Sequence, residues 1–289
     1  MTETKMKAIL VPTDFSKNAE NAINFAVAFA KKENAMLILL HAYHFTYPVS
    51  DFPDEIIVEE ISETKKISEE KLKTLCLKIM QTDKVICERV CKEGLATDVI
   101  LEASEKIHPD FIVMGTKGAS GIKEVFVGSN TAKVIEKSQH PVIAVPDSAV
   151  FHGIKKITYA TDYYESDIDA IKTLSEIAEP FKAVINILHI SNGEYIPESE
   201  KELLKQFVSK VSKKVDYNNF SFQLILGQDV ETELSNYVIN DSTDLLSMST
   251  LHRNLWEKIF GKSITKKLTY HTRVPLLAFH HKKESAVFI

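Results

Sequence analysis

The sequence predicts an α/β protein made of two similar domains in tandem, each a parallel sheet with helices on both faces. Three observations predict this class. The chain has 289 residues, which is about the length of two ordinary domains. Continuous apolar runs of strand length alternate with amphipathic stretches of helix length, as in parallel sheets that are buried on both faces. Finally, landmarks of the first half recur in the second.

The first half is expected to form a five-stranded parallel sheet. Its strands are the apolar runs 7–13, 36–42, 84–90, 110–114 and 141–145. The first helix follows Ser16, whose hydroxyl can cap it, and carries apolar residues at helical spacing. The other helices are expected over 54–81, 96–107 and 129–137.

The second half repeats this order. Its strands are expected at 154–161, 184–189, 220–226, 244–248 and 275–279. Ser166 with Asp169 has the spacing of a capping box, which predicts that a helix begins there. Two more helices are expected over 197–215 and 230–239.

The repeat is visible in the register of individual residues. The pair Thr13-Asp14 recurs as Thr161-Asp162. Four further landmarks recur 134 positions later without a gap: Asp110, Met114, Ser129 and Pro141 match Asp244, Met248, Ser263 and Pro275. This agreement predicts one domain over 1–147 and a second over 153–283.

Composition excludes several classes of partner and compartment. The formal net charge is −5 and neither half is basic, so we expect no nucleic acid, which requires a positive footprint. No apolar run has the length of a membrane span, and we expect no signal peptide. Cys76, Cys87 and Cys91 are few and odd in number, which suits a reducing cytoplasm. Buried thiols are favoured over a metal pair at Cys87 and Cys91.

The strongest local signal for chemistry is a glycine-rich stretch that follows the strand 110–114. Gly115 and Gly118 come directly after this strand, and Gly128-Ser129 opens the next helix. Glycine permits positive φ and close approach of a ligand. A helix N-terminus adds unpaired N–H groups and a positive dipole end. The combination predicts a phosphate cradle at the carboxyl ends of parallel strands; a plain glycine-rich loop before a capped helix is the alternative.

Asp14 supports the same location. It follows Pro12 and Thr13 at the carboxyl end of the first strand. The first and fourth strands of a doubly wound sheet are usually neighbours, so Asp14 and Gly115 are expected to face one crevice. A carboxylate there can accept hydrogen bonds from an adenine amine or a ribose hydroxyl. It can also simply cap the following helix.

These motifs resemble those of the universal stress protein family in its tandem form, with Rossmann-like or flavodoxin-like domains. The resemblance rests on the opening VPTDFS, the strand ending LLHA, and the spacing of Gly115, Gly118, Gly128 and Ser129. It implies that Asp14 (with Pro12 and Thr13) and Ala42 meet the adenosine end of a nucleotide. It also implies that ribose and phosphates are lined by Met114, Gly115, Gly118, Gly128, Ser129 and Asn130. Asn130 departs from the small apolar residue common in the family, and Lys117 and Lys123 are expected to be solvated.

The second half departs from the pattern at all three glycines. Gly115 becomes Ser249, Gly118 becomes His252 and Gly128 becomes Lys262, although Asp162 and Ser263 remain. We therefore expect one nucleotide per chain, held by the first half.

The resemblance implies a cytoplasmic stress-response module that binds ATP, with or without Mg²⁺; ADP and AMP are alternative ligands. A slow ATPase or phosphotransferase and a nucleotide-free scaffold are the other hypotheses, and little or no catalysis is expected. The two halves are expected to pair as a pseudo-dimer through 141–145 and 275–279, because two apolar edge strands protect each other. A further homodimer and a protein partner stay open.

Overall fold

The computed structural model describes residues 6–44, 54–116, 128–250 and 274–280. The chain divides into two compact units, Met1–His140 and Pro141–Ile289. The strand 142–145 thus falls in the second unit, whereas the sequence repeat puts it at the end of the first domain. The domain limits 1–147 and 153–283 stay a prediction from that repeat.

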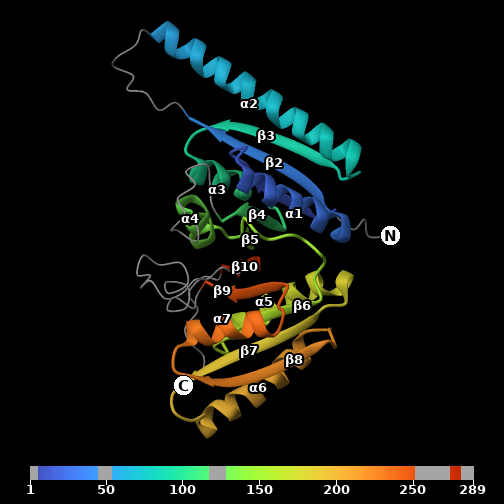
Figure 1. Ribbon diagram of the computed structural model, residues 1–289, viewed down its shortest axis with the longest axis vertical. Helices are drawn as coiled ribbons and strands as arrows, with labels where there is room; N and C mark the ends of the chain where they lie inside the picture. The colour runs from blue at the N-terminus through green and yellow to red at the C-terminus, as the bar shows by residue number, and fades with distance from the viewer. Residues whose placement is uncertain (1–5, 45–53, 117–127, 251–273, 281–289) are drawn as a thin grey trace. The chain divides into compact units, whose positions relative to one another are not determined.

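The first unit alternates strands and helices in the predicted order (Figure 1). Its elements are β1 (Ala8–Pro12), α1 (Lys17–Glu33), β2 (Met36–Tyr43), α2 (Asp54–Thr82), β3 (Cys87–Glu93), α3 (Ala96–Ile107), β4 (Phe111–Gly115) and α4 (Ser129–Lys137). The strands lie in the order β3-β2-β1-β4, and the pairs β2–β3, β1–β2 and β1–β4 are parallel. The strand order reverses between β1 and β4, which is where α/β sheets of this type bind ligands.

Local sequence accounts for the way β1 and α1 are placed. Ile9, Leu10 and Val11 have no exposed surface, as expected for a strand covered on both faces. The start of β1 is tied down by Asp110, whose Oδ2 accepts a hydrogen bond from the Ala8 amide at 2.7 Å. Ser16 caps α1 as predicted, since its Oγ accepts from the amide of the third following residue at 3.2 Å.

The described residues of the second unit form six strands. Its elements are β5 (Val142–Val145), β6 (Lys156–Ala160), α5 (Glu165–Ala178), the 3₁₀ turn η2 (Glu179–Phe181), β7 (Val184–Asn192), α6 (Glu198–Lys214), β8 (Phe220–Gly227), α7 (Val230–Asn240), β9 (Leu245–Ser249) and β10 (Leu276–Phe279). The strand order is β5-β10-β9-β6-β7-β8. The pairs β9–β10, β6–β9, β6–β7 and β7–β8 are parallel.

The pair β5–β10 departs from the parallel arrangement. These strands run antiparallel, with Leu276 opposite Ala144 and Ala278 opposite Val142. The predicted pairing of 141–145 with 275–279 is therefore confirmed, and the sheet is mostly rather than purely parallel. Both strands are buried along their whole length, so each covers an apolar edge that would otherwise be open to association.

The start of α5 differs from the prediction. The helix begins at Glu165 with Tyr164 as its N-cap, and Asp167 rather than Asp169 fills the carboxylate position of the capping box. Asp167 Oδ2 accepts from the Tyr164 amide at 3.2 Å. The predicted pair of Ser166 and Asp169 was wrong because Asp167 is fully buried at the helix start, whereas Asp169 is exposed.

The turn after β1 in the first unit is the same as the turn after β6 in the second. Phe15 and Tyr163 have positive φ angles of 61° and 63°. Their amides donate to the hydroxyls of Thr13 and Thr161 at 3.1 and 2.9 Å. These hydroxyl bonds form a tight turn at each strand end, which sends the helix back across the sheet.

A histidine on the next strand along the chain, β2 or β7, supports this turn in each unit. His41 and His189 each place Nδ1 2.7 Å from the carbonyl oxygen of the turn threonine, Thr13 or Thr161. Each imidazole also packs on the aromatic ring of the turn, with centroids 4.5 Å apart in the first unit and 4.4 Å apart in the second. The equivalent residues lie 148 positions apart, which extends the repeat seen in the sequence.

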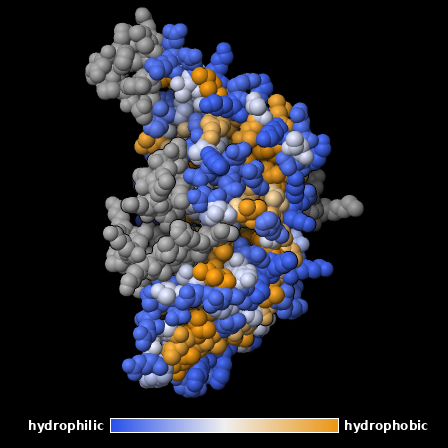
Figure 2. Space-filling view, viewed as in Figure 1, coloured by the Kyte–Doolittle hydropathy of each residue, from blue (hydrophilic) through white to orange (hydrophobic). Residues whose placement is uncertain are grey.

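Figure 2 shows mainly hydrophilic side chains on the visible described surface, interspersed with smaller apolar patches. Among the described residues, no helix combines the length and apolar character that a membrane span needs.

Candidate functional site

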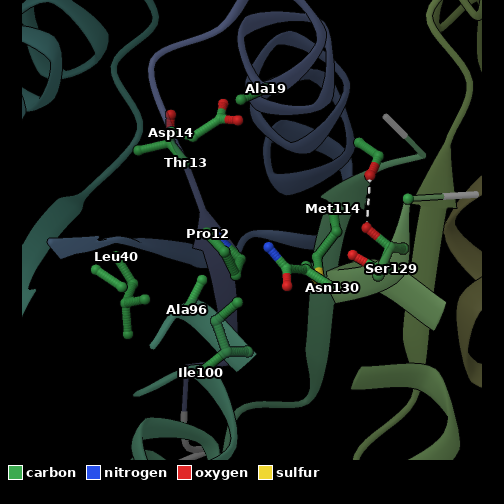
Figure 3. A pocket seen from close by; sticks show the side chains of 14 residues that line it. Pro12, Thr13, Asp14, Ala19, Leu40, Ala96, Ile100, Met114, Ser129 and Asn130 are labelled. Atoms are coloured by element: carbon green, nitrogen blue, oxygen red, sulfur yellow. Dashed lines mark hydrogen bonds between the residues drawn. The ribbon is translucent and has the colours of Figure 1, made fainter. Parts of the chain in front are cut away.

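A cavity of about 310 Å³ lies in the first unit where β1 and β4 end. This volume falls in the range of small-molecule sites in proteins. Four segments form its wall, as Figure 3 shows: the end of β1 with the first turn of α1, the end of β2, the start of α3, and the end of β4 with the start of α4. The cavity thus occupies the topological switch point of this sheet.

Asp14, on the β1 side of the cavity, is the one ionisable residue among the described residues that line it. Asp14 is exposed, and its Oδ1 accepts a hydrogen bond from the Ser16 amide at 3.0 Å. The carboxylate is therefore oriented by the turn, in agreement with a role at the helix start. A carboxylate has several lone-pair sites, so this bond leaves acceptor capacity for a ligand.

The opposite side of the cavity is formed by β4 and α4, which two hydrogen bonds join. Thr131, which is buried, donates its hydroxyl to the Gly115 carbonyl at 2.8 Å. The Gly128 amide donates to the Thr116 carbonyl. These bonds hold the N-terminus of α4 beside the end of β4.

The N-terminus of α4 supplies the cavity with hydrogen-bond donors. Gly128 is the N-cap and makes no side-chain cap bond, and its carbonyl accepts the first helical bond from Ala132 at 3.0 Å. The amides of Ser129, Asn130 and Thr131 precede that bond, so helical geometry gives them no partner within the helix. Such amides, aligned with the positive end of the helix dipole, form an anion site.

Gly115 and Gly128 do not act through positive φ. Gly128 has φ −60° and ψ 151°, and Gly115 is not among the described residues with positive φ. A residue with a Cβ atom can adopt these backbone angles. The expectation that glycine is needed there for its φ angle is therefore wrong, and its value lies in the close approach that a missing side chain permits.

Asn130 lies at the centre of the α4 side. Its side-chain Oδ1 accepts a hydrogen bond from the hydroxyl of Thr97, at the start of α3, at 3.2 Å. In Figure 3 the Asn130 side chain extends toward Pro12, across the cavity from its own helix. Because Thr97 holds the oxygen, the NH₂ group is left as the donor that faces the cavity.

The structure brings together all the described residues that the sequence singled out. Nine line the cavity: Pro12, Thr13, Asp14, Ala42, Met114, Gly115, Gly128, Ser129 and Asn130. Gly118, Lys117 and Lys123 lie outside the described residues. Sequence reasoning missed five other lining residues, namely Ala19, Leu40, Ala96, Ile100 and Thr131. The sequence places these five residues near the starts of helices or on a buried strand. Such positions do not by themselves distinguish a residue that lines a cavity from a residue of the hydrophobic core.

Comparison with known proteins identifies the family. The profile of the universal stress protein family matches residues 5–146. A universal stress protein of Thermus aquaticus is 30% identical over 139 residues, which are 48% of this chain and 98% of that protein. Another, from Methanocaldococcus jannaschii, is 32% identical over 144 residues, covering 50% of this chain and 84% of the relative. The chain belongs to the universal stress protein family.

The fold of this universal stress protein extends the likeness to the second half. The crystal structure of a universal stress protein from Archaeoglobus fulgidus has a TM-score of 0.70 and 17% identity, and the match covers 96% of this chain and 99% of that one. At this identity the likeness shows the fold.

In the second unit, a hydrophobic cluster lies at the positions equivalent to the cavity walls of the first. Six wall residues have equivalents in the second unit by sequence offset: Pro12 matches Ala160, Leu40 matches Leu188, Ala42 matches Ile190, Ala96 matches Val230, Ile100 matches Leu234, and Met114 matches Met248. Ala160, Leu188, Ile190, Leu234 and Met248 belong to one buried hydrophobic cluster, and Val230 packs against it. Two of the exchanges, Ala42 to Ile190 and Ala96 to Val230, add bulk. The equivalents of the cavity walls are thus core residues in the second unit.

A buried carboxylate adds to this filling. Asp167 corresponds to Ala19, which lines the cavity of the first unit. Its Oδ1 accepts from the Tyr159 hydroxyl at 2.8 Å and its Oδ2 from the Thr161 hydroxyl at 2.6 Å. Burial, together with the neighbouring charge of Asp167, holds the pKa of Tyr159 well above its usual value, so the hydroxyl keeps its proton and donates. The second unit therefore completes its own hydrogen bonds where the first presents an open wall.

Proposed function

We propose that this universal stress protein binds one adenine nucleotide per chain, ATP in the first instance, in the cavity of its first unit. The observation that carries the proposal is the α4 N-terminus held at the end of β4, with the amides of Ser129, Asn130 and Thr131 beside the cavity. Fixed amides at a helix N-terminus favour phosphate, because they carry partial positive charge and are already oriented.

The remaining walls suit a nucleoside. Leu40, Ala42, Ala96 and Ile100 provide apolar surface for a base. Asp14 provides a carboxylate that can accept from ribose hydroxyls or an exocyclic amine. We assign the Asn130 NH₂ group as a further donor to the phosphates or the ribose, oriented by Thr97.

Binding by the first unit alone is supported by side-chain packing rather than by the glycine positions. Ile190, Leu234 and Met248 occupy the second unit's equivalent of the walls, and Asp167 brings a carboxylate to the Ala19 position. A nucleotide there would have to displace packed core residues, each worth about 1.5–3 kcal/mol in burial. His252 and Lys262, on which the sequence argument depended, lie outside the described residues.

We infer a binding module rather than an enzyme. Hydrolysis needs an oriented water and stabilisation of leaving-group charge, whereas Asp14, the ionisable group of the described lining, is engaged by the turn amide of Ser16. Steady ATP turnover of roughly one per second or faster, lost in a variant that cannot bind ATP, would favour the alternative of an ATPase. ATP is proposed with or without Mg²⁺, so Mg²⁺ is varied in the assay.

The test is calorimetry on the full chain with ATP, ADP and AMP, with and without Mg²⁺, after mass spectrometry of nucleotide released from freshly purified protein. We expect a stoichiometry of one. Gly118→Asp adds bulk and negative charge to the predicted cradle and should abolish binding, while His252→Asp, its matched control in the second half, should change the affinity little. A stoichiometry near two, or binding that survives Gly118→Asp, contradicts the proposal.

A further inference from the structure

Two cysteine side chains meet between the long helix α2 and the edge strand β3 of the first unit. Figure 1 shows α2 lying along β3. The Sγ atoms of Cys76, on α2, and Cys87, on β3, are 2.8 Å apart. Both side chains are buried, with exposed fractions of 1% and 7%, and both thiols are free. This contact lies apart from the cavity described above, whose lining includes neither residue.

The contact brings the sulfurs near bonding distance. A disulfide bond is about 2.0 Å long, so the sulfur atoms need to approach by roughly 0.8 Å. Leu72 and Ile79, which flank Cys76 on α2, are buried with it. Their burial keeps the helix face against the strand, so the two thiols stay opposed rather than meeting by chance in a mobile region.

The surroundings distinguish the two thiols. The Cys76 Sγ lies 3.2 Å from the Glu88 carbonyl oxygen. The hydrogen bond from Cys87 lowers the pKa of the Cys76 thiol, and Arg89 contributes in the same direction. The same hydrogen bond and burial raise the pKa of Cys87. Burial opposes the lowering at Cys76, and the Cys76 thiol donates to the Glu88 carbonyl. Of the two thiols, Cys76 is the one whose pKa is lowered, and the thiolate is the reactive form of cysteine.

We propose that Cys76 and Cys87 form a reversible disulfide when a hydroperoxide oxidises the chain. In the first step the Cys76 sulfur attacks a peroxide oxygen, the O–O bond breaks, and hydrogen peroxide leaves one molecule of water and a sulfenic acid on Cys76. In the second step the Cys87 sulfur attacks the Cys76 sulfur, and the hydroxyl leaves as a second water. Two thiols are oxidised and one peroxide is reduced, and a dithiol reductant restores both thiols.

The third cysteine offers an internal control. Cys91 lies on β3 but is only half buried, and burial with the nearby Glu69 raises its pKa. If exposure alone governed oxidation, Cys91 would react first. The geometry instead assigns the reaction to the opposed pair.

The experiment uses the full chain exposed to hydrogen peroxide, then blocked with an alkylating reagent, digested with trypsin and analysed by mass spectrometry. The three cysteines fall in separate tryptic peptides, 74–78, 85–89 and 90–92, so each pairing has its own mass. We expect 74–78 linked to 85–89, with loss of two hydrogen atoms, and recovery of both free peptides after dithiothreitol. Cys91→Ser should form the same link.

Cys87→Ser should stop at a sulfenic acid on Cys76, which a sulfenic acid reagent traps. The cross-link constrains the unfolded chain, so oxidation should raise the Tm of the wild type and of Cys91→Ser by several degrees, but not that of Cys76→Ser. A link through Cys91, irreversible oxidation of Cys76 without a cross-link, or no link under conditions that oxidise Cys91 would overturn the proposal. These readings need no nucleotide, so they stand apart from the test of ATP binding.

Discussion

Filling the cavity of the first unit with the residues of the second should weaken nucleotide binding without loss of stability. The perturbation is the double substitution Ala42→Ile and Ala96→Val, which copies Ile190 and Val230. Both alanines line the cavity. If the packing argument is right, the two exchanges convert an open wall into the closed core seen in the second unit.

The magnitude follows from the atoms added. The exchanges introduce five carbon atoms on the wall of a cavity of about 310 Å³. A ligand forced against such groups meets overpacking of about 1–3 kcal/mol, equivalent to a loss of roughly 5- to 150-fold in affinity, since 1.4 kcal/mol is tenfold. In the free protein the same carbons gain burial at up to about 0.8 kcal/mol each. Stability and affinity should therefore change in opposite directions.

Calorimetry with ATP and denaturant unfolding of the nucleotide-free protein measure the two quantities. Ala28→Val is the matched control, because Ala28 is half-buried on α1 outside the cavity lining; it should leave ATP affinity unchanged. Unchanged affinity in the double variant would refute the assignment of this cavity as the nucleotide site. A fall in stability that matches the fall in affinity would refute the packing argument.

Two further predictions concern stability. Asp167→Ala leaves the buried hydroxyl donors and one amide without their acceptor and should cost about 3–5 kcal/mol in the free energy of unfolding. The control is Asp169→Ala, an exposed position on the same helix, which should change that free energy by less than about 0.5 kcal/mol. Equal effects of the two substitutions would contradict the network. Burial lowers the pKa of His140, with His108 acting in the same direction and Glu105 against it. As the pH falls, the unfolded chain therefore takes up this proton before the folded chain does. The free energy of unfolding should decrease as the pH drops below about 6.5. Denaturant unfolding at pH 7.5 and 5.5 should show a smaller fall in His140→Gln than in the wild type, and an equal fall would remove His140 as the cause.

Most of the fold was predictable because its signals are local. Continuous apolar runs such as β1 and β4 predict buried parallel strands, and Ser16 marked the start of α1. The direction of β5 was not predictable in the same way. Its four residues are as apolar as any parallel strand, and its antiparallel partner β10 is more than a hundred residues away in the chain. Direction of pairing is set by such distant contacts, which periodicity does not record.

The site was predictable where a backbone feature has a sequence signature. Gly115, Gly128 and Ser129 follow from the strand–glycine–helix order, and Asp14 from the end of the first strand; all four line one cavity. Ala19 and Ala96 carry no such signature, because a small residue on a helix face fits a core as well as a cavity. In the second half, Asp167 stands at the position of Ala19 and Val230 at the position of Ala96. These exchanges become informative only once the packing of the second unit is known.

The second unit shows which repeated residues belong to the fold and which to the site. The turn threonine and the histidine that contacts its carbonyl are kept in both units with the same 2.7 Å distance, although residues at the cavity walls differ between the units. Asp162 is repeated as well, and its Oδ1 lies 3.6 Å from His189 Nδ1. The repeated threonine and histidine are therefore explained by the shared turn, whereas the exchanges at Ala19, Ala42 and Ala96 change residues that line the cavity. The proposal of one nucleotide per chain therefore rests on these exchanges and not on the turn, which is the same in both units.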